Sequence, residues 1–306
     1  MISDGRVGVI GVPTSAGAFA PGQEQAPAAL REAGLVRLLR DGGLEISDYG
    51  DCEVWRWRPD RERRRAQNLG KAVEIVDDTA QRVGESILAR ETTVVLGGDC
   101  TVGIGTVAGH VAAADGVGLL YFDLHADLNV PDSVREGTLD WMGMAHMLGV
   151  DGAARELLEV GSRNPLLAPE QVLLFAWGRE GAQPGEREAV DRLGVEAITD
   201  DQVRADAAGA AQRALDSLTS RVDRVLVHFD VDVVDFTDTP LSENPGRNEG
   251  IAYERAAEAL AVLLASPKLA GLTVTELNPN HVEEGAGSIE RLARDLAAGL
   301  TRPAAS

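Results

Sequence analysis

The chain has 306 residues, of which 44% are hydrophobic and 25% are charged, and this is enough apolar sequence for one sizeable globular α/β domain over residues 1–306. The formal net charge of −20 and a pI near 4.6 argue against nucleic acid and anionic membranes as partners. Two cysteines are too few for a disulfide framework, nothing near Met1 resembles a signal peptide, and no apolar run reaches about 18 residues, so a cytoplasmic protein is expected.

Short apolar strands alternate with amphipathic helices along the sequence. The segment AVEIVDDTAQRVGESILAR leads to TTVVLGG, and AAQRALDSLTSRV leads to DRVLVHFDVD. This alternation predicts a parallel sheet that is covered by helices on both faces. Because ligands of such sheets bind beyond the carboxyl ends of the strands, functional side chains are expected at those ends.

One such strand end lies in TTVVLGGDCTVGIG, where Gly97 and Gly98 permit a tight turn from strand to helix. Asp99 and Cys100 follow directly, so an acidic side chain and a thiol stand at this strand end. Two further acidic strand ends come later in the chain.

These later strand ends carry Asp123, His125 and Asp127 after GVGLLYF, and Asp230 and Asp232 after RVLVHF. Alternate residues of an extended chain share one face, so the side chains of D-x-H-x-D and of D-x-D converge. A D-x-D pair alone is also typical of a solvated turn or a cap, but three crowded ionisable groups repel each other unless a cation lies between them. Such oxygen and nitrogen ligands suit divalent ions such as manganese, and two carboxylate clusters favour a binuclear centre.

A last acidic residue, Glu276, stands in TVTELNPNHVEEG near the end of the chain. Taken alone, Glu276 is compatible with a salt-bridged strand end. Its place after another apolar strand adds Glu276 to the same edge of the predicted sheet.

The order of these motifs, GGD-x, D-x-H-x-D-x-N, D-V-D and E-x-N-P, resembles the arginase and agmatinase family of ureohydrolases from about residue 8 to residue 280. The resemblance implies an arginase-like three-layer α/β/α fold with a mostly parallel central sheet. It also implies a small-molecule guanidino substrate and a homo-oligomer, either a trimer or a hexamer.

The same resemblance implies two divalent metal ions, Mn²⁺ in the first place, held by two overlapping ligand sets. The first set is Cys100, Asp123, Asp127 and Asp230, and the second set is Asp123, His125, Asp230 and Asp232. A hydroxide between two such ions is a strong nucleophile near neutral pH and would attack the guanidine carbon. By the same resemblance, Asp127 is a catalytic acid and Glu276 anchors the guanidinium, while Asn129 and Glu186 contact the substrate.

Three departures from the family pattern limit what can be carried over, and the first is at the metal site itself. Cys100 stands where the family usually has a histidine ligand. A thiolate is softer than an imidazole and would shift the metal preference towards Zn²⁺ or Fe²⁺. The alternative is a buried thiol that leaves this ion under-coordinated or absent.

The second departure follows from a gap-free match of DLHADLNVPDSVREGTLDWMGMAHMLG to the family pattern. Asp140 falls on the usual second active-site histidine, and Glu136 and Thr138 replace side chains that help to hold an amino acid carboxylate. Asp140 is either a catalytic acid whose pKa is raised by burial, or a loop cap. His146 is either a proton carrier or, as is usual for a single histidine in an apolar helix, a core residue.

The third departure lies in FAWGREGAQPGERE, which resembles a family segment through Arg179, Pro184, Gly185 and Glu186. The aspartate that binds an α-amino group in the family is missing, so a free arginine head group would lose an ionic contact of roughly 1.5–3 kcal/mol. A cysteine for the metal-binding histidine, together with loss of the second histidine, is also found in ureohydrolases that act on N-hydroxyarginine. A hydroxyguanidine is therefore a candidate substrate.

The sequence thus predicts a metal-dependent hydrolase that cleaves a C–N bond of a guanidino compound and releases urea or hydroxyurea. Two alternatives remain: a catalytically silent or regulatory relative that keeps the fold, and a hydrolase of a related amidine or formimino group. In the loop FTDTPLSENPGRNEGI, contacts with the distal part of a substrate are expected from Glu243, Asn244 and Arg247, if the loop is more than surface.

Overall fold

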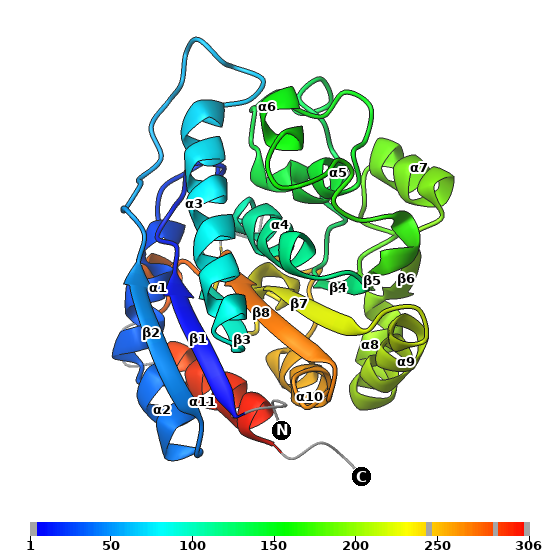
Figure 1. Ribbon diagram of the computed structural model, residues 1–306. Coiled ribbons are helices and arrows are strands. Elements are labelled where there is room, and N and C mark those ends of the chain that lie inside the picture. The colour runs from blue at the N-terminus through cyan, green and yellow to red at the C-terminus, as the bar shows by residue number, and fades with distance from the viewer. Residues whose placement is uncertain (1–4, 243–246, 284–286, 303–306) are drawn as a thin grey trace.

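The computed structural model describes residues 5–242, 247–283 and 287–302, and its centre is one eight-stranded sheet (Figure 1). The strands are β1 (Arg6–Gly11), β2 (Glu45–Asp51), β3 (Thr92–Leu96), β4 (Val117–Phe122), β5 (Val172–Trp177), β6 (Glu196–Thr199), β7 (Arg224–Asp230) and β8 (Leu269–Thr275). Their order across the sheet is β2-β1-β3-β8-β7-β4-β5-β6, and each neighbouring pair is parallel. The predicted parallel sheet is confirmed.

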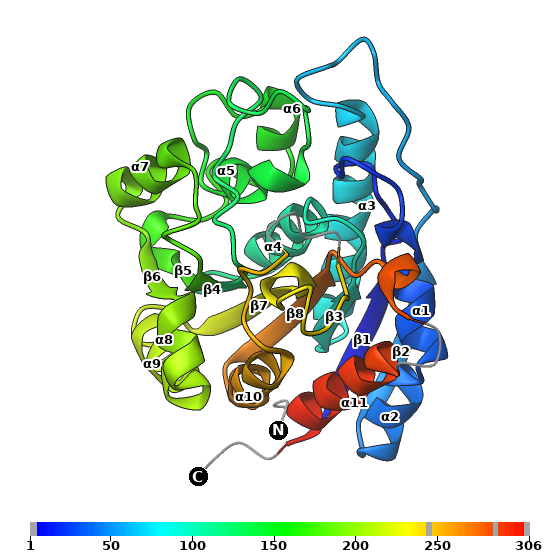
Figure 2. The same cartoon turned by 180° about the vertical axis from the view of Figure 1, so that it is seen from behind.

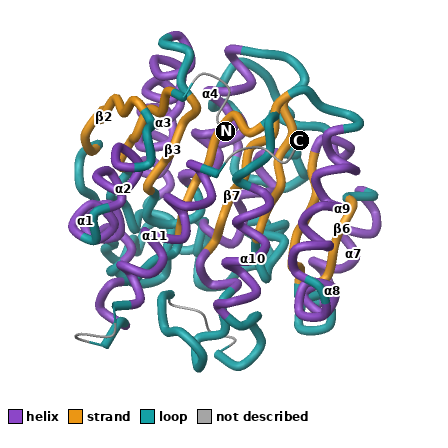
Figure 3. The backbone as a smooth tube through the Cα atoms, turned by 90° about the horizontal axis from the view of Figure 1, so that it is seen from below, coloured by secondary structure: helices purple, strands orange, loops and turns teal. Residues whose placement is uncertain are grey.

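Helices cover both faces of the sheet, as the opposite views in Figures 1 and 2 show. One face carries α3 (Leu69–Leu88), α4 (Val102–Ala113), α5 (Gly143–Met147), α6 (Arg155–Leu158) and α7 (Pro184–Leu193). The other face carries α1 (Ala26–Glu32), α2 (Leu35–Asp41), α8 (Asp200–Ala205), α9 (Ala207–Thr219), α10 (Tyr253–Leu263) and α11 (Ser288–Thr301). Figure 3 shows α11, α10 and α9 in a row across this second face. The three-layer α/β/α prediction is confirmed.

Short 3₁₀ turns mark several loops between these elements. They are η1 (Gln23–Gln25), η2 (Asp140–Met142), η3 (Pro169–Gln171), η4 (Val231–Val233) and η5 (Pro279–His281). Of these, η2 and η4 follow strand ends that carry predicted site residues. None of the described helices combines the length and the apolar character that a membrane span needs. The assignment of residues 1–306 to one domain stays a prediction.

The strand side chains divide between the two helical layers by simple alternation. In β4, Leu120 and Phe122 join the core under α9 and α10, whereas Leu119 and Tyr121 join the core under α3 and α4. This period of two follows from the pleat of the strand. Because both faces are covered, the central strands are apolar almost throughout, and polar side chains near their carboxyl ends require a specific reason.

Helix α4, which begins just after the predicted metal-binding turn, packs unusually closely on α3. A Cβ atom on Gly105 would lie 2.6 Å from the Val76 carbonyl oxygen, and one on Gly109 would lie 2.7 Å from the Ala80 carbonyl oxygen. Glycine at these two positions therefore lets the helix backbones approach each other. This contact fixes α4, and with it the turn at the end of β3, against the rest of the layer.

Candidate metal centre and active site

The turn after β3 places Cys100 in the interior, with only 1% of its surface exposed. Gly98 makes the turn possible, because a Cβ atom there would overlap the Thr14 carbonyl oxygen at 1.7 Å. Asp99 then ties the turn to the loop after β1, since its Oδ2 accepts a hydrogen bond from Gly17 N at 2.9 Å. The predicted strand-to-helix turn is therefore built by a glycine and an aspartate that is not itself one of the predicted ligands.

The ends of β4 and β7 bring a second group of side chains together. His125 Nδ1 lies 3.3 Å from Asp123 Oδ1 and 3.2 Å from Asp232 Oδ2. Asp123 Oδ1 also accepts the His125 backbone N–H at 2.7 Å, and Asp230 Oδ1 accepts the Asp232 backbone N–H at 2.7 Å. Both acidic motifs therefore fold back on their own backbone, which turns their carboxylates towards one another.

Cys100 connects these groups, because its Sγ lies 2.8 Å from Asp230 Oδ2. Three sets have ligand atoms that all lie within 4.8 Å of one another: Cys100, Asp123 and Asp127; Asp123, His125 and Asp232; and Cys100, His228 and Asp230. Asp123 belongs to the first two sets, as a bridging carboxylate would. The structure thus gathers the predicted metal-binding residues at one edge of the sheet, while their ligation of an ion stays a prediction.

The electrostatics of the cluster fit divalent cations. Burial, followed by the charge of Asp232, raises the pKa of Asp123 to about 7. Burial and neighbouring carboxylates also raise the pKa of Asp127 and that of Asp230 well above the usual range. Among the described residues, the buried Asp123 Oδ2 has no hydrogen-bond partner. A cation would relieve both the repulsion and the unpartnered oxygen, and this donor set suits Mn²⁺, Zn²⁺ or Fe²⁺.

Two residues of the site, Tyr121 and His228, were missed by sequence reasoning. The Tyr121 hydroxyl donates a hydrogen bond to Asp127 Oδ2 at 2.6 Å. The ring of His228 stacks on Tyr121 at 4.4 Å between centroids, and its Nε2 lies 3.3 Å from Cys100 Sγ. Each of the two stands two residues before a predicted ligand, so the strand alternation was the signal that could have revealed them.

Glu276, at the end of β8, is buried and oriented by two N–H donors rather than by a cationic side chain. Its Oε1 accepts the Cys100 backbone N–H at 2.9 Å, and its Oε2 accepts Gln23 Nε2 at 3.2 Å. Burial, followed by the charge of Asp99, raises the pKa of Glu276 well above its usual value. A carboxylate held in this way beside the cluster is suited to receive a cation.

Two of the predicted catalytic residues have a strained backbone. Asp127 has φ 48° and Glu276 has φ 63°, which is the left-handed region that side chains other than glycine disfavour. Such strain costs on the order of 1–3 kcal/mol for each residue and persists only where the surroundings impose it. Its occurrence at two residues of one cluster is typical of a functional site.

Asp140 is buried at the same edge and begins η2. Its backbone N–H donates to the Gly17 carbonyl oxygen at 3.2 Å, and its carboxyl group interacts with the Trp141 backbone N–H. Within the described part of the chain, Asp140 Oδ1 has no hydrogen-bond partner. Burial, and then the charge of Glu276, raises the pKa of Asp140 well above its usual value. These contacts are compatible with an acid, and that role stays a prediction.

His146 lies in α5 with 1% of its surface exposed. Its Nδ1 donates to the Met142 carbonyl oxygen at 2.7 Å, and its Nε2 accepts the Ala154 backbone N–H at 3.0 Å. Burial lowers the pKa of His146 to about 4. Both ring nitrogens of His146 make hydrogen bonds, so His146 has the contacts of a neutral core residue rather than those of a proton carrier.

The two predicted substrate contacts differ in their surroundings. Asn129 is half-buried, and its Oδ1 accepts a hydrogen bond from Ser133 Oγ at 3.2 Å. Glu186 is buried, and its Oε1 accepts the Ala126 backbone N–H at 3.1 Å. Glu186 therefore supports the loop that carries His125 and Asp127, and its contact with a substrate stays a prediction.

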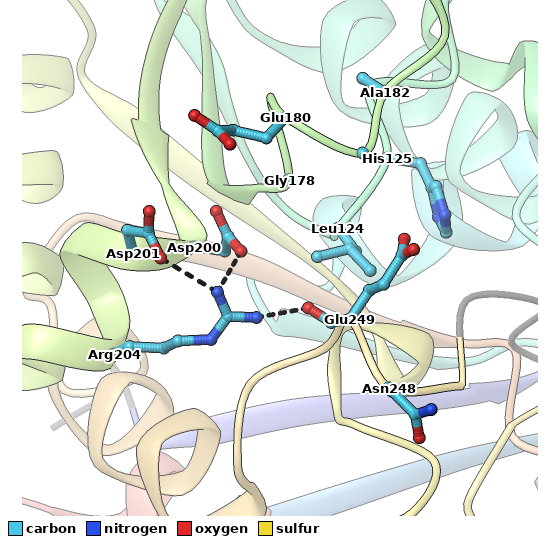
Figure 4. A pocket seen from close by; sticks show the side chains of 11 residues that line it. Leu124, His125, Gly178, Glu180, Ala182, Asp200, Asp201, Arg204, Asn248 and Glu249 are labelled. Carbon is cyan, nitrogen blue, oxygen red and sulfur yellow. Dashed lines mark hydrogen bonds and ion pairs between the residues drawn. The ribbon is translucent and has the colours of Figure 1, made fainter.

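A pocket of about 360 Å³ lies beside His125 (Figure 4). Arg204 lines it and is held by Asp200, by Asp201 at 3.2 Å and by the Glu249 carbonyl oxygen. In Figure 4 the Glu249 carboxylate points towards His125. The positive charge of the pocket is thus neutralised and a carboxylate faces the cluster, which does not favour an anionic substrate tail.

The loop that precedes this pocket is described only in part. Arg247 lies over the ring of Phe236, with its guanidinium carbon 4.3 Å from the ring centroid. Glu243 and Asn244, which were expected to contact a substrate tail together with Arg247, lie outside the described residues.

A thiol, an imidazole and several carboxyl groups, all gathered at the carboxyl edge of a parallel sheet, define a class of protein. It is the class of metal-dependent hydrolases with an α/β fold, which use metal-bound water as the nucleophile. The sequence model of the Arginase family matches residues 5–301, and the chain belongs to this family. The family prediction is confirmed, and membership supports a metal-dependent amidinohydrolase.

Individual relatives agree with this assignment. The arginase of Bacillus subtilis (strain 168) is 28% identical over 277 residues, which cover 90% of this chain and 91% of that protein. The native structure of arginase from Bacillus caldovelox superposes with a TM-score of 0.86 at 25% identity, over 97% of this chain and 98% of that chain. Formimidoylglutamase from Bacillus subtilis shares the fold with a TM-score of 0.75 at 17% identity, over 97% of this chain and 88% of that chain.

Proposed function

We propose that this protein hydrolyses a C–N bond of a guanidino compound and releases urea or hydroxyurea. The observation that carries the proposal is the double use of Cys100. Its Sγ lies in the predicted metal cluster, 2.8 Å from Asp230 Oδ2, while its backbone N–H holds Glu276 Oε1 at 2.9 Å. A site for a nucleophile and a carboxylate for a planar cation are therefore fixed to the same residue.

The ions would be held by Cys100, Asp123, His125, Asp127, Asp230 and Asp232. When bound, two divalent ions supply a water of lowered pKa as the nucleophile. The protein supplies orientation: Glu276 pairs with the guanidinium, and its two N–H donors prevent the carboxylate from turning away. The burial of Glu276 keeps this pairing out of bulk water, where it would be weak.

Asp127 is the proton carrier of the proposed mechanism. The Tyr121 hydroxyl fixes Asp127 Oδ2 at 2.6 Å, so Oδ1 is the atom left for proton transfer to the departing nitrogen. Asp140, a buried carboxyl group at the same edge, is a second acid in this proposal.

Among guanidino compounds, we propose a hydroxyguanidine such as N-hydroxyarginine as the first candidate substrate. Hydrolysis of such a compound to hydroxyurea expels the same alkylamine as hydrolysis of arginine to urea, so the leaving group does not distinguish the two substrates. The choice rests on Cys100 and Asp140, which stand where the family usually has two histidines, as in ureohydrolases that act on N-hydroxyarginine.

The test combines metal analysis with a screen for products. The protein is purified in Mn²⁺, its metal content is measured by elemental analysis, and urea and hydroxyurea are assayed with arginine, agmatine, guanidino acids and N-hydroxyarginine. About two ions per chain with turnover of one compound supports the proposal. Turnover of a formimino compound alone would replace it, and two silent assays with one ion or none would favour a non-catalytic relative.

We also propose that the protein is a cytoplasmic homo-oligomer, a trimer or a hexamer. A thiol that serves as a metal ligand must stay reduced, and the cytoplasm provides this condition. Light scattering after size-exclusion chromatography measures the subunit number directly, and a monomer at micromolar concentration would contradict the oligomer.

A further inference from the structure

The cluster contains a buried imidazole, that of His228, which neither ligand set predicted from the sequence includes, although its ring lies within 4.8 Å of ligand atoms of Cys100 and Asp230. His228 stands in β7, with 1% of its surface exposed, and its Nε2 lies 3.3 Å from Cys100 Sγ. Thr275 Oγ1 lies 3.1 Å from the same sulfur and 3.1 Å from His228 Nε2. A histidine and a threonine thus converge on the one cluster residue that departs from the family pattern.

The surroundings of His228 are shaped for a flat ring. One side stacks on Tyr121 at 4.4 Å between centroids and 13° between planes. On α4, a Cβ atom on Gly103 would lie 2.7 Å from His228 Nδ1. Gly103 stands in the first turn of α4, and its lack of a side chain leaves the space that the ring needs.

The direction of the hydrogen bond follows from the state of the sulfur. A cysteine that binds a metal does so as a thiolate and has no proton to give. His228 Nε2 must then be the donor, and Nδ1, which has no hydrogen-bond partner within the described residues, needs no proton. The Thr275 hydroxyl is placed to donate to the same sulfur.

We propose that His228 is a positioning residue of the metal centre, whose Nε2–H donates a hydrogen bond to the Cys100 thiolate. This inference rests on the proposed metal-binding role of Cys100. This hydrogen bond withdraws electron density from the sulfur and holds the sulfur at the cluster. The family's neutral histidine ligand is thus replaced here by a cysteine thiolate whose negative charge is partly offset by His228. Partners of this kind orient metal ligands and tune the metal.

The test is spectroscopic and uses the full chain loaded with Co²⁺, whose bond to a thiolate gives a charge-transfer absorption in the near ultraviolet. In His228→Leu the band should move to lower energy, because the sulfur electrons are no longer stabilised, and the Co²⁺ dissociation constant should rise about 10- to 100-fold. In His228→Gln both should stay close to the wild-type values, because the amide N–H takes the place of Nε2–H.

A matched control is available in His110, a second buried histidine that pairs with a threonine. His110 Nε2 lies 2.9 Å from Thr93 Oγ1, and neither residue belongs to the cluster. His110→Leu should leave the band and the dissociation constant unchanged. If His228→Leu does not fold, Thr275→Val provides a second variant, which removes the other donor to the sulfur at nearly constant volume and should move the band in the same direction.

Three results would overturn the inference. A folded His228→Leu protein with the band at the wild-type energy would show that no hydrogen bond reaches the sulfur. Loss of Co²⁺ from His228→Gln would make the imidazole a direct ligand rather than a donor. A wild-type protein without the band, checked against Cys100→Ser, would remove Cys100 from the metal site. In that last case, urea or hydroxyurea release with two bound ions would leave the proposed function intact.

Discussion

Cys100 is the residue on which the choice of metal depends in the proposed metal centre. It is buried, and both its sulfur and its backbone N–H are engaged by other residues of the site. In Cys100→His, the affinity for Mn²⁺ should rise by roughly tenfold, since imidazole suits manganese better than a soft thiolate does. Titration calorimetry with Mn²⁺ and Zn²⁺ measures this change. Turnover of the hydroxyguanidine should fall at the same time, and a rise would contradict the view that the thiolate is matched to that substrate.

Glu276 provides a second test at the scale of one residue. In Glu276→Gln, kcat/KM for the guanidino substrate should fall about 10- to 150-fold, which corresponds to the roughly 1.5–3 kcal/mol of a hydrogen bond to a charged group. Glutamine keeps an oxygen for the Cys100 backbone N–H, so folding should be preserved. Steady-state kinetics at equal metal content measure the loss, and an unchanged kcat/KM would exclude Glu276 as the guanidinium anchor.

His146 makes a prediction about acid stability. Its folded-state pKa of about 4 lies below the unfolded value near 6.5, so the unfolded chain takes up the proton first. Stability from the neutral ring is therefore present above about pH 6.5 and is lost as the pH falls towards 4, by up to about 3 kcal/mol. Urea denaturation of wild type and His146→Gln across this range isolates the effect, because all other groups cancel. Parallel curves would contradict it.

At the scale of elements, the α3 and α4 contact predicts opposite effects of two glycine substitutions. Gly109→Ala should destabilise the protein by about 1–3 kcal/mol, because the new Cβ would meet Ala80 O and Val83 at 2.7 Å. Gly84→Ala, in α3 with open space around it, should stabilise by about 0.5–1 kcal/mol. Chemical denaturation of the two variants at equal metal content checks the pair, and effects of equal sign would show that the helices do not pack this closely.

The strands and the positions of the ligands were predictable at this scale because each depends on local pattern. An apolar β-branched run followed by D-x-H-x-D fixes both a buried strand and the direction of its last side chains. Tyr121 and His228 were not predicted, because each lies inside such a run, where the sequence pattern indicates a core residue. What makes them part of the site is contact with Asp127 and Cys100 across the sheet, and no single segment carries that information.

For the whole molecule, the crowded carboxyl groups predict a strong link between metal binding and stability. Removal of metal with a chelator should lower the unfolding temperature. Metal ion at 100 times its dissociation constant should restore about 2.7 kcal/mol of unfolding free energy per site. Differential scanning calorimetry with and without Mn²⁺ measures this. Asp123→Asn, which changes the carboxylate shared by both ligand sets, should lose most of the difference. Superimposable wild-type curves would argue against a metal centre.

The overall architecture was predictable because strand and helix signals alternate along the chain, and a parallel sheet covered on both faces is the stable solution for that pattern. The order of the strands was not predictable from local pattern. It depends on which strands pair at long range, and in particular on β8, the last strand in the sequence, lying between β3 and β7. Of the strands whose ends form the site, β8 lies beside β7, the strand before it in the sequence, whereas β3 and β4 are separated by β8 and β7.

The central position of β8 has a consequence for biosynthesis. Until residues 269–275 have left the ribosome, the nascent chain can form only two separate sheets, β2-β1-β3 and β7-β4-β5-β6, each with an unprotected edge. Cys100 lies at the end of a strand in the first sheet, and Asp123 and Asp230 lie at the ends of strands in the second. Cys100 therefore reaches the other predicted ligands only when β8 joins the two sheets, so filling of the ligand set that contains Cys100 is expected to follow completion of the sheet and to mark the chains that have finished folding.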